Sequence, residues 1–279
     1  MLKNVEETVR KRKSVRSYEP VPLSPGDRER VEDLIREAEE GFCPFDGRVG
    51  IRLLEMKKGT GTEKLGTYGV IRGAKDFLCV TAEETETAME AVGYRVEKLV
   101  LEATEMGLGT CWLAGTFNRE RFTGALELRE GEIFPIVCPI GYPLDKKTLV
   151  NSLFRRASGS DHRKPWEEIF FDGAFGVPLT EEAAGAYAFP LEMLRLAPSA
   201  ANRQPWRVVR KDGAYHFFRE GNMKAGYGYD LQRLDTGICA CHFHLAAEER
   251  ALKGSFVAVE ETGIETPENV KYLFSWKEN

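Results

Sequence analysis

Two stretches of this chain match each other without a gap, and this internal repeat is the strongest constraint on how the chain can fold. Residues 99–112, LVLEATEMGLGTCW, align with residues 243–256, FHLAAEERALKGSF. An apolar, strand-like segment follows each stretch, IVCPIGY in the first half and VKYLFSW in the second. Unrelated helices often share an apolar period, but a helix and a strand repeated in the same order indicate an internal duplication. The aligned pairs are Leu101 with Leu245, Ala103 with Ala247, Glu105 with Glu249, Leu108 with Leu252, Trp112 with Phe256 and, further back, Gly93 with Gly237.

The repeat predicts an α+β fold of two similar halves, each a small sheet flanked by helices, packed on each other through their long central helices. The first central helix is expected over residues 87–106. It should end at Gly107 and Gly109, where glycine supplies the backbone freedom that a helix end needs. Buried strands are expected before it, at residues 77–84, and after it, at residues 133–141.

Composition limits the class of protein. The chain has 279 residues, a net charge of -5 and no long apolar run. These features indicate a globular protein that neither crosses a membrane nor attracts nucleic acid by its overall charge. The N-terminus is charged from the third residue, so no secretory leader is expected. The six cysteines lie mostly in apolar segments, which favours free thiols in a reducing, cytoplasmic location over a disulfide framework.

The first half carries a basic segment, RKRKSVR at residues 10–16, that the second half does not repeat. Guanidinium groups offer forked donors that suit phosphate oxygens, and Ser14 adds a hydroxyl donor. The alternative is a basic tail that is simply solvated. Composition alone leaves both interpretations open.

The second half carries a different polar segment, LAPSAANRQPWRVV at residues 196–209. Two prolines bracket small polar residues, which is typical of a rigid loop that enters a strand and often binds a ligand. The first half has only REAEEGFCPFDG in the corresponding place. Each half has therefore lost what the other retains. Within the loop, Trp206 is expected to be a packing anchor rather than a platform for a substrate.

The segments RKSVRSYEPVP, APSAANRQPW, GLGTCWLAG, IGYP and RKPWEEIFF together resemble the signature of the FMN-dependent nitroreductase family. They touch most of the chain, and the first two are the most specific. In that family two identical subunits intertwine, and each flavin lies between them. This chain resembles two such subunits fused, and in particular the two-repeat, single-chain branch known as the TM nitroreductases. The resemblance implies an α+β nitroreductase-like fold, duplicated as a pseudo-dimer within one chain, with one composite site kept and the other eroded.

The resemblance also implies a cofactor, FMN, an electron donor, NAD(P)H, and a small-molecule acceptor such as a nitro compound or a quinone. The residues that would hold the phosphate and the ribityl or pyrimidine end are Arg12, Lys13, Ser14, Arg16 and Arg163. Those that would bracket the isoalloxazine from the other half are Pro198, Ser199, Ala200 and Asn202. Backbone N–H groups of Ala114 and Gly115 would approach flavin N5, and Thr67 falls near a position where relatives place a polar flavin contact. The flavin performs the chemistry, so no catalytic acid or base is assigned.

Two departures from the family pattern would weaken flavin binding. Asp161 stands where relatives often carry a second basic residue before the tail arginine, and its carboxylate would repel a phosphate. The segment LGTYGVIRGA lacks the usual asparagine and lysine. The first repeat is predicted to span residues 1–160 and the second residues 161–279. Because one chain would complete its own site, a monomer is expected.

The segment CACHFH, residues 239–244, raises the alternative of a metal site. It contains four ligand types, but on a helix only residues three or four apart share a face. Neither resulting pair supplies the four ligands of a closed zinc site, so no metal is predicted. Two alternatives to the enzyme stay open. One is a non-catalytic flavin-binding or sensing protein, and the other is a chain that keeps the fold without the cofactor.

Overall fold

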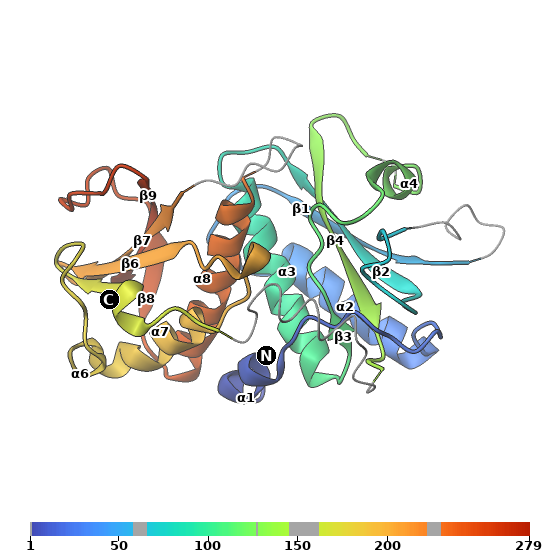
Figure 1. Ribbon diagram of the computed structural model, residues 1–279, viewed down its shortest axis with the longest axis horizontal. Helices are drawn as coiled ribbons and strands as arrows, with labels where there is room; N and C mark the ends of the chain where they lie inside the picture. The colour runs from blue at the N-terminus through green and yellow to red at the C-terminus, as the bar shows by residue number, and fades with distance from the viewer. Residues whose placement is uncertain (1, 58–65, 127, 145–161, 222–229) are drawn as a thin grey trace.

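The computed structural model describes residues 2–57, 66–126, 128–144, 162–221 and 230–279. Two sheets flank a central pair of helices, α3 (Ala88–Glu105) and α8 (Leu231–Glu249), which lie side by side in the middle of the molecule (Figure 1). The first half of the chain builds the sheet on one side and the second half the sheet on the other. Both central helices are buried over almost their whole length.

The two sheets share one strand order. The first sheet has the order β1-β2-β4-β3 and the second the order β5-β6-β7-β9-β8. All neighbours are antiparallel except β5, which pairs parallel to β6 at the edge of the second sheet. Without β5, the second sheet repeats the order of the first. The strands are β1 (Val49–Glu55), β2 (Asp76–Glu83), β3 (Gly109–Thr110), β4 (Glu132–Gly141), β5 (Phe170–Asp172), β6 (Trp206–Lys211), β7 (Ala214–Glu220), β8 (Gly254–Val257) and β9 (Val270–Glu278).

Shorter helices surround this framework. They are α1 (Val5–Lys11), α2 (Pro25–Glu40), α4 (Arg119–Thr123), α6 (Glu181–Ala184) and α7 (Ala188–Arg195), with 3-10 turns at Trp166–Glu168, Gly185–Tyr187 and Ala200–Asn202. A second trace of the duplication precedes α2 and α6, where VPLS at residues 21–24 corresponds to VPLT at residues 177–180. The hydroxyl that ends each segment caps the helix that follows, by accepting a backbone N–H at 3.1 Å.

The two central helices meet at equivalent glycines. A Cβ atom added to Gly93 would lie 2.1 Å from the carbonyl oxygen of Leu234, and one added to Gly237 would lie 2.1 Å from that of Glu90. Glu90 stands in the same place before Gly93 as Leu234 does before Gly237. Reciprocal contacts between equivalent residues are what a two-fold axis between identical subunits produces. The predicted internal duplication is therefore confirmed, and its pseudo-two-fold axis passes between these glycines.

The helices α3 and α8 also end in the same way. At the end of α3, Leu108 N donates to Ala103 O at 2.9 Å, and at the end of α8, Leu252 N donates to Ala247 O at 2.9 Å. The residue in the left-handed conformation is a glycine in the first half, Gly107 (φ +81°), and an alanine in the second (φ +54°). One half has kept the residue that this cap prefers.

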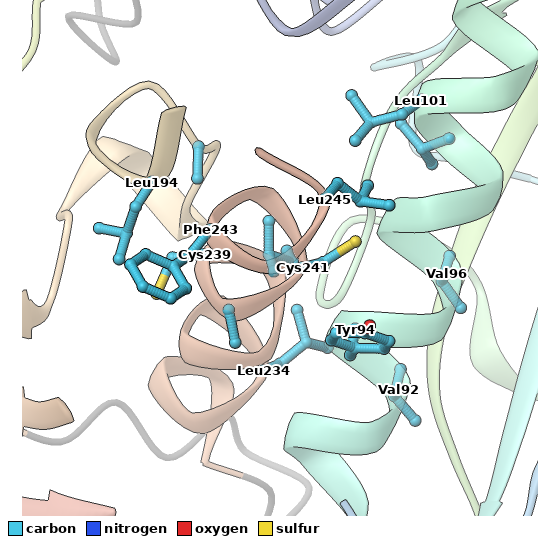
Figure 2. Packing of buried hydrophobic residues seen from close by; sticks show 14 of the residues in the cluster. Val92, Tyr94, Val96, Leu101, Leu194, Leu234, Cys239, Cys241, Phe243 and Leu245 are labelled. Atoms are coloured by element: carbon cyan, nitrogen blue, oxygen red, sulfur yellow. The ribbon is translucent and has the colours of Figure 1, made fainter. Parts of the chain in front are cut away.

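Helix α8 has apolar residues on opposite sides because it packs against α3 on one side and against α7 on the other. Figure 2 shows Cys241 and Leu245 on the side of α8 that faces α3, whereas Cys239 and Phe243 lie on the opposite side with Leu194. A helix that is apolar all round belongs in the interior. The predicted buried strands and central helices are confirmed, with β2, β4 and α3 close to the expected bounds.

Several other expectations concern the core and the chain boundaries. Trp206 is fully buried, so the predicted packing anchor is confirmed. All six cysteines are free thiols. Among the described residues, no helix is long and apolar enough to cross a bilayer. The predicted boundary between residues 160 and 161, and Asp161 itself, lie outside the described residues.

Candidate functional site

A cavity of about 480 Å³ lies where the N-terminal segment of the first half meets the proline-bracketed loop of the second. The segment follows α1, which lies at the foot of the α3 and α8 pair in Figure 1, and the loop follows α7. Residues from both halves of the chain therefore share one hollow. The lining residues are Val9, Arg10, Lys11, Arg12, Lys13, Ser14, Arg16, Arg163, Leu196, Pro198, Ser199, Ala201 and Asn202.

The N-terminal segment is built into the fold. Residues 5–11 form α1, which packs on α3 and α8, and Val15 N donates to Thr110 O at 2.8 Å. A Cβ atom at Gly109 would meet the Val15 side chain at 2.8 Å. Gly109, the second glycine of the turn Gly107–Leu108–Gly109 (the GLG turn), therefore makes room for the N-terminal segment. The segment is therefore not a free tail, although the side chains of Arg10, Lys11 and Lys13 are exposed.

The loop has a strained backbone. Ala201 (φ +51°), Asn202 (φ +54°) and Gln204 (φ +49°) all adopt the left-handed conformation, which is unfavourable for residues other than glycine. Such a conformation persists only when its surroundings hold it. Arg163 supplies part of this support, since its Nη2 donates to Leu196 O at 3.0 Å and its Nη1 to Asn202 Oδ1 at 3.2 Å.

A second support comes from α8 beneath the loop. The backbone N–H of Ala200 donates to both carboxylate oxygens of Asp235, at 2.9 and 3.1 Å. Ser199 Oγ accepts from Gln204 N at 2.9 Å and closes the turn. The loop is therefore tied to the segment at residues 162–164 through Arg163 and to the central helix α8 through Asp235.

The charge of the cavity suits an anion. In the part of the chain that the structure describes, six basic side chains line it, those of Arg10, Lys11, Arg12, Lys13, Arg16 and Arg163, and no carboxylate does. The buried Nε of Arg12 has no hydrogen-bond partner among the described residues. Forked cationic donors next to a hydroxyl are the donor set that a phosphate needs, so the residues present fit the phosphate end of FMN.

Arg12 leads from the cavity to a buried polar cluster between the halves. Its Nε lies 3.8 Å from Glu97 Oε1. That same oxygen lies 2.9 Å from His242 Nε2, and Glu97 Oε2 accepts from Trp112 Nε1 at 2.8 Å. Glu97 and His242 are both fully buried. One carboxylate thus joins the basic segment, the GLG turn and the opposite central helix.

The hydrogen bonds of His242 fix the charge of this cluster. Its Nδ1 lies 3.0 Å from Met193 O, and because a carbonyl oxygen only accepts, Nδ1 is the donor. A proton must therefore lie between Nε2 and Glu97, on one atom or the other. In either case Arg12, Glu97 and His242 together carry one net positive charge. This buried charge adds to the attraction of the cavity for an anion.

Eight of the twelve predicted site residues line the cavity. They are Arg12, Lys13, Ser14, Arg16, Arg163, Pro198, Ser199 and Asn202. The role expected of Asn202 is changed, because its amide is hydrogen-bonded to residues 162 and 163: Oδ1 accepts from Arg163, and Nδ2 donates to His162 O at 2.9 Å. Arg163 likewise donates hydrogen bonds to the loop, so Asn202 and Arg163 both shape the cavity as well as line it.

The remaining four predicted residues do not line the cavity. The Ala200 N–H donates to Asp235, and the neighbouring residue Ala201 lines the cavity instead of Ala200. Thr67 lies in a separate hollow of about 350 Å³ with Met56 and Phe77, and its hydroxyl accepts from Ile71 N at 3.3 Å. Two more, Ala114 and Gly115, follow the GLG turn; the Ala114 carbonyl accepts from Arg119 at 3.4 Å, and a Cβ at Gly115 would meet nothing within 4 Å.

Sequence reasoning missed the residues that support the cavity from below, Glu97, Asp235 and His242. The available signal was a charged or polar residue in a helix that was expected to be buried, where burial demands a partner. The repeat offered a further signal for Asp235, because the equivalent residue of α3 is Ala91.

The histidines of the segment CACHFH, residues 239–244, have partners other than a metal. His242 contacts Glu97, and His244 contacts Tyr94. Within the described ranges, no group of three ligand residues could hold a metal ion.

The corresponding loop of the first half packs an aromatic side chain, Phe45, among other aromatic rings. It runs between α2 and β1, and Phe45 within it is buried. The Phe45 ring lies 4.9 Å from that of Phe274, 6.0 Å from Phe256 and 6.1 Å from Tyr94, measured between centroids. The first-half loop therefore contributes to the core where the second-half loop lines a cavity.

Comparison with known proteins agrees with this architecture. The sequence matches the family described as "Putative TM nitroreductase" over residues 4–247. The crystal structure of a "putative nitroreductase" from Thermotoga maritima covers 99% of this chain and 94% of its own, with 19% identity and a TM-score of 0.60. That likeness confirms the fold over the whole chain.

Shorter structures match about half of the chain. A nitroreductase family protein from Clostridium difficile covers 60% of this chain and 96% of its own, at 20% identity and a TM-score of 0.42. A "putative nitroreductase in complex with fmn" from Desulfovibrio desulfuricans covers 55% of this chain and 96% of its own, at 19% identity and a TM-score of 0.41. Among curated proteins, none matches. Since the family pattern spans most of the sequence, the chain belongs to the family described as "Putative TM nitroreductase".

Proposed function

We propose that this protein is an FMN-dependent oxidoreductase of the nitroreductase type, which takes hydride from NAD(P)H and reduces a nitro compound, a quinone or a similar acceptor. The observation that carries the proposal is the cavity, in which the basic segment of one half and the proline-bracketed loop of the other face each other. Family membership supports the reaction class. When bound, FMN supplies the redox chemistry, and the protein supplies binding, orientation and electrostatics.

The chain's own residues divide these tasks. Arg12, Lys13, Ser14 and Arg16 would hold the phosphate, with the buried positive charge behind Arg12 adding to the attraction. Pro198 and Ser199 would border the ring system from the other half. The free thiols and the absence of a spanning helix among the described residues fit the cytoplasmic location that we also propose.

The reaction can be tested on the purified chain with added FMN. We expect NAD(P)H to be oxidised under anaerobic conditions over many turnovers only when a quinone or nitro acceptor is present; without one, oxidation should stop once the added FMN has been reduced. A protein that binds FMN but fails to oxidise NAD(P)H with any such acceptor would instead be a flavin-binding or sensing protein. A protein that binds no FMN would refute both.

We expect one FMN per chain, bound by the monomer. Of the two equivalent loops, the second-half loop borders the cavity, whereas Phe45 of the first-half loop is packed in the core. Titration of the protein with FMN, followed by flavin fluorescence, measures the stoichiometry, and light scattering measures the mass of the loaded protein. Two flavins per chain, or a flavin bound only by a dimer, would contradict the single composite site.

Replacing Arg16 by alanine should weaken FMN binding by about 2 kcal/mol, roughly thirtyfold, because it removes a charge-assisted, forked contact to the phosphate. The effect should shrink with riboflavin, which lacks the phosphate. Arg36→Ala is the matched control, since Arg36 is exposed and pairs with Asp33 on α2, away from the cavity. Unchanged FMN affinity of the Arg16 variant at low salt would remove the phosphate site from this segment.

A further inference from the structure

Asp235 is a buried carboxylate that reaches from α8 to the loop of the cavity. Its relative exposure is 2%. Among the described residues, the donor to both of its oxygens is the backbone N–H of Ala200, at 2.9 and 3.1 Å. Ala200 lies at the centre of the loop that lines the cavity, between Ser199 and Ala201. Within the part of the chain that the structure describes, no cation pairs with this carboxylate.

We expect this arrangement to lower the stability of the fold where the carboxyl is ionised. Burial raises the pKa of the Asp235 carboxyl to about 8, and the negative charge of Asp230, which caps the same helix, adds to the rise. Another titratable group that faces it is the thiol of Cys239, one turn further along α8. A carboxyl buried without a cation is costly, and an apolar residue would serve the core better. The equivalent residue of α3 is in fact an alanine, Ala91, which is fully buried.

The buried carboxyl of Asp235 supports the loop that lines the cavity. Three of its residues hold a left-handed backbone, which needs support from the surroundings. Arg163 supports the loop from one side through Leu196 and Asn202. Asp235 supports it from below through Ala200. The half that lines the cavity has this aspartate, and the half whose loop is packed in the core has alanine in its place.

We infer that Asp235 is a positioning residue for the cavity: through the Ala200 N–H it holds the loop at residues 198–204 in the shape that receives the cavity's ligand. Naming FMN as that ligand rests on the proposed function. The support that Asp235 gives to the loop does not rest on the proposed function, because it is a property of the protein without a ligand. Function and stability therefore oppose each other at this residue.

Asp235→Asn separates a positioning role from a merely structural one. Asparagine keeps the shape but removes the charge and one of the two acceptor oxygens, so above about pH 8, where Asp235 is ionised, the Ala200 N–H is held less strongly and FMN binding should weaken by about tenfold. Its melting temperature should rise relative to the original protein. Because folding raises this pKa, the original protein loses stability as the pH rises toward about 8, and the gain should therefore be larger at about pH 8 than at about pH 6. Loss of both stability and FMN affinity would assign Asp235 a structural role only.

Glu90→Gln is the matched control. Glu90 is a buried carboxyl of α3, with a pKa that burial raises to about 7, and it pairs with Arg233 outside the cavity. Its replacement should leave FMN affinity unchanged. Hydrogen exchange of residues 196–204 gives a readout that needs no flavin: it should be faster in the Asp235 variant and unchanged in the control. Unchanged exchange in the Asp235 variant would overturn the inference, whereas absence of FMN binding by the original protein would overturn only the proposed function.

Discussion

Replacing either Gly93 or Gly237 by alanine is expected to destabilise the protein by about 3 kcal/mol or more. The added methyl group would lie 2.1 Å from a backbone carbonyl oxygen of the opposite helix. That oxygen belongs to a regular helix and cannot turn aside as a flexible side chain can. The two central helices would have to move apart, and the closely packed layer around them would loosen. Urea unfolding of each variant measures the loss.

Pseudo-symmetry adds a more specific expectation for the double variant. Each glycine faces the turn of helix that carries the other, so the separation forced by one methyl group makes room for the second. The double variant should therefore lose less than the sum of the single losses. Gly26→Ala, in α2, is the control, because a Cβ there meets nothing within 4 Å. It should be neutral or stabilising by about 0.5 kcal/mol. Losses equal to the control would show that the helices do not depend on this contact.

The repeat could be predicted because duplication leaves a trace along the sequence itself. The alignment of residues 93–112 with residues 237–256 pairs Gly93 with Gly237, and the two lie together at the axis. The composite cavity followed from the resemblance, since each half carries one specific segment. The match between VPLS and VPLT is also visible in the sequence, and it would have extended the repeat to the helices that follow these two segments.

The parts that could not be predicted are contacts between distant residues. Glu97 and His242 are each one of several polar residues on their helices, and nothing in the sequence pairs them. Ala200 belonged to the expected motif, but nothing in the sequence shows that its N–H donates to a buried carboxylate of α8. Thr67 was placed by a loose match, and it lies in a separate hollow. The motif therefore identified the segments, while packing decided which atoms of each segment line the cavity.

Replacing Glu97 by glutamine should cost about 3 kcal/mol of folding stability. The Arg12 side chain is 7% exposed, and His242 is fully buried. When the shared proton lies on His242, Glu97 is the anion next to Arg12, and glutamine leaves the Arg12 charge buried without it. Breaking a buried ion pair by removing one partner costs more than forming the pair gains, because the remaining charge has been taken out of water. Urea unfolding at neutral pH measures the loss.

The loss should be shared with His242 in a way that a double variant reveals. If the proton between Glu97 and His242 is what joins them, the effects of Glu97→Gln and His242→Asn should be coupled by about 1 kcal/mol or more. Glu120→Gln, at an exposed residue of α4, makes the same chemical change and should alter stability by less than about 0.5 kcal/mol. Additive effects of the two buried substitutions would mean that Glu97 stabilises Arg12 and Trp112 independently of the opposite helix. Coupled effects would place the contact among those that hold the two halves of the chain, and with them the two sides of the cavity, in register.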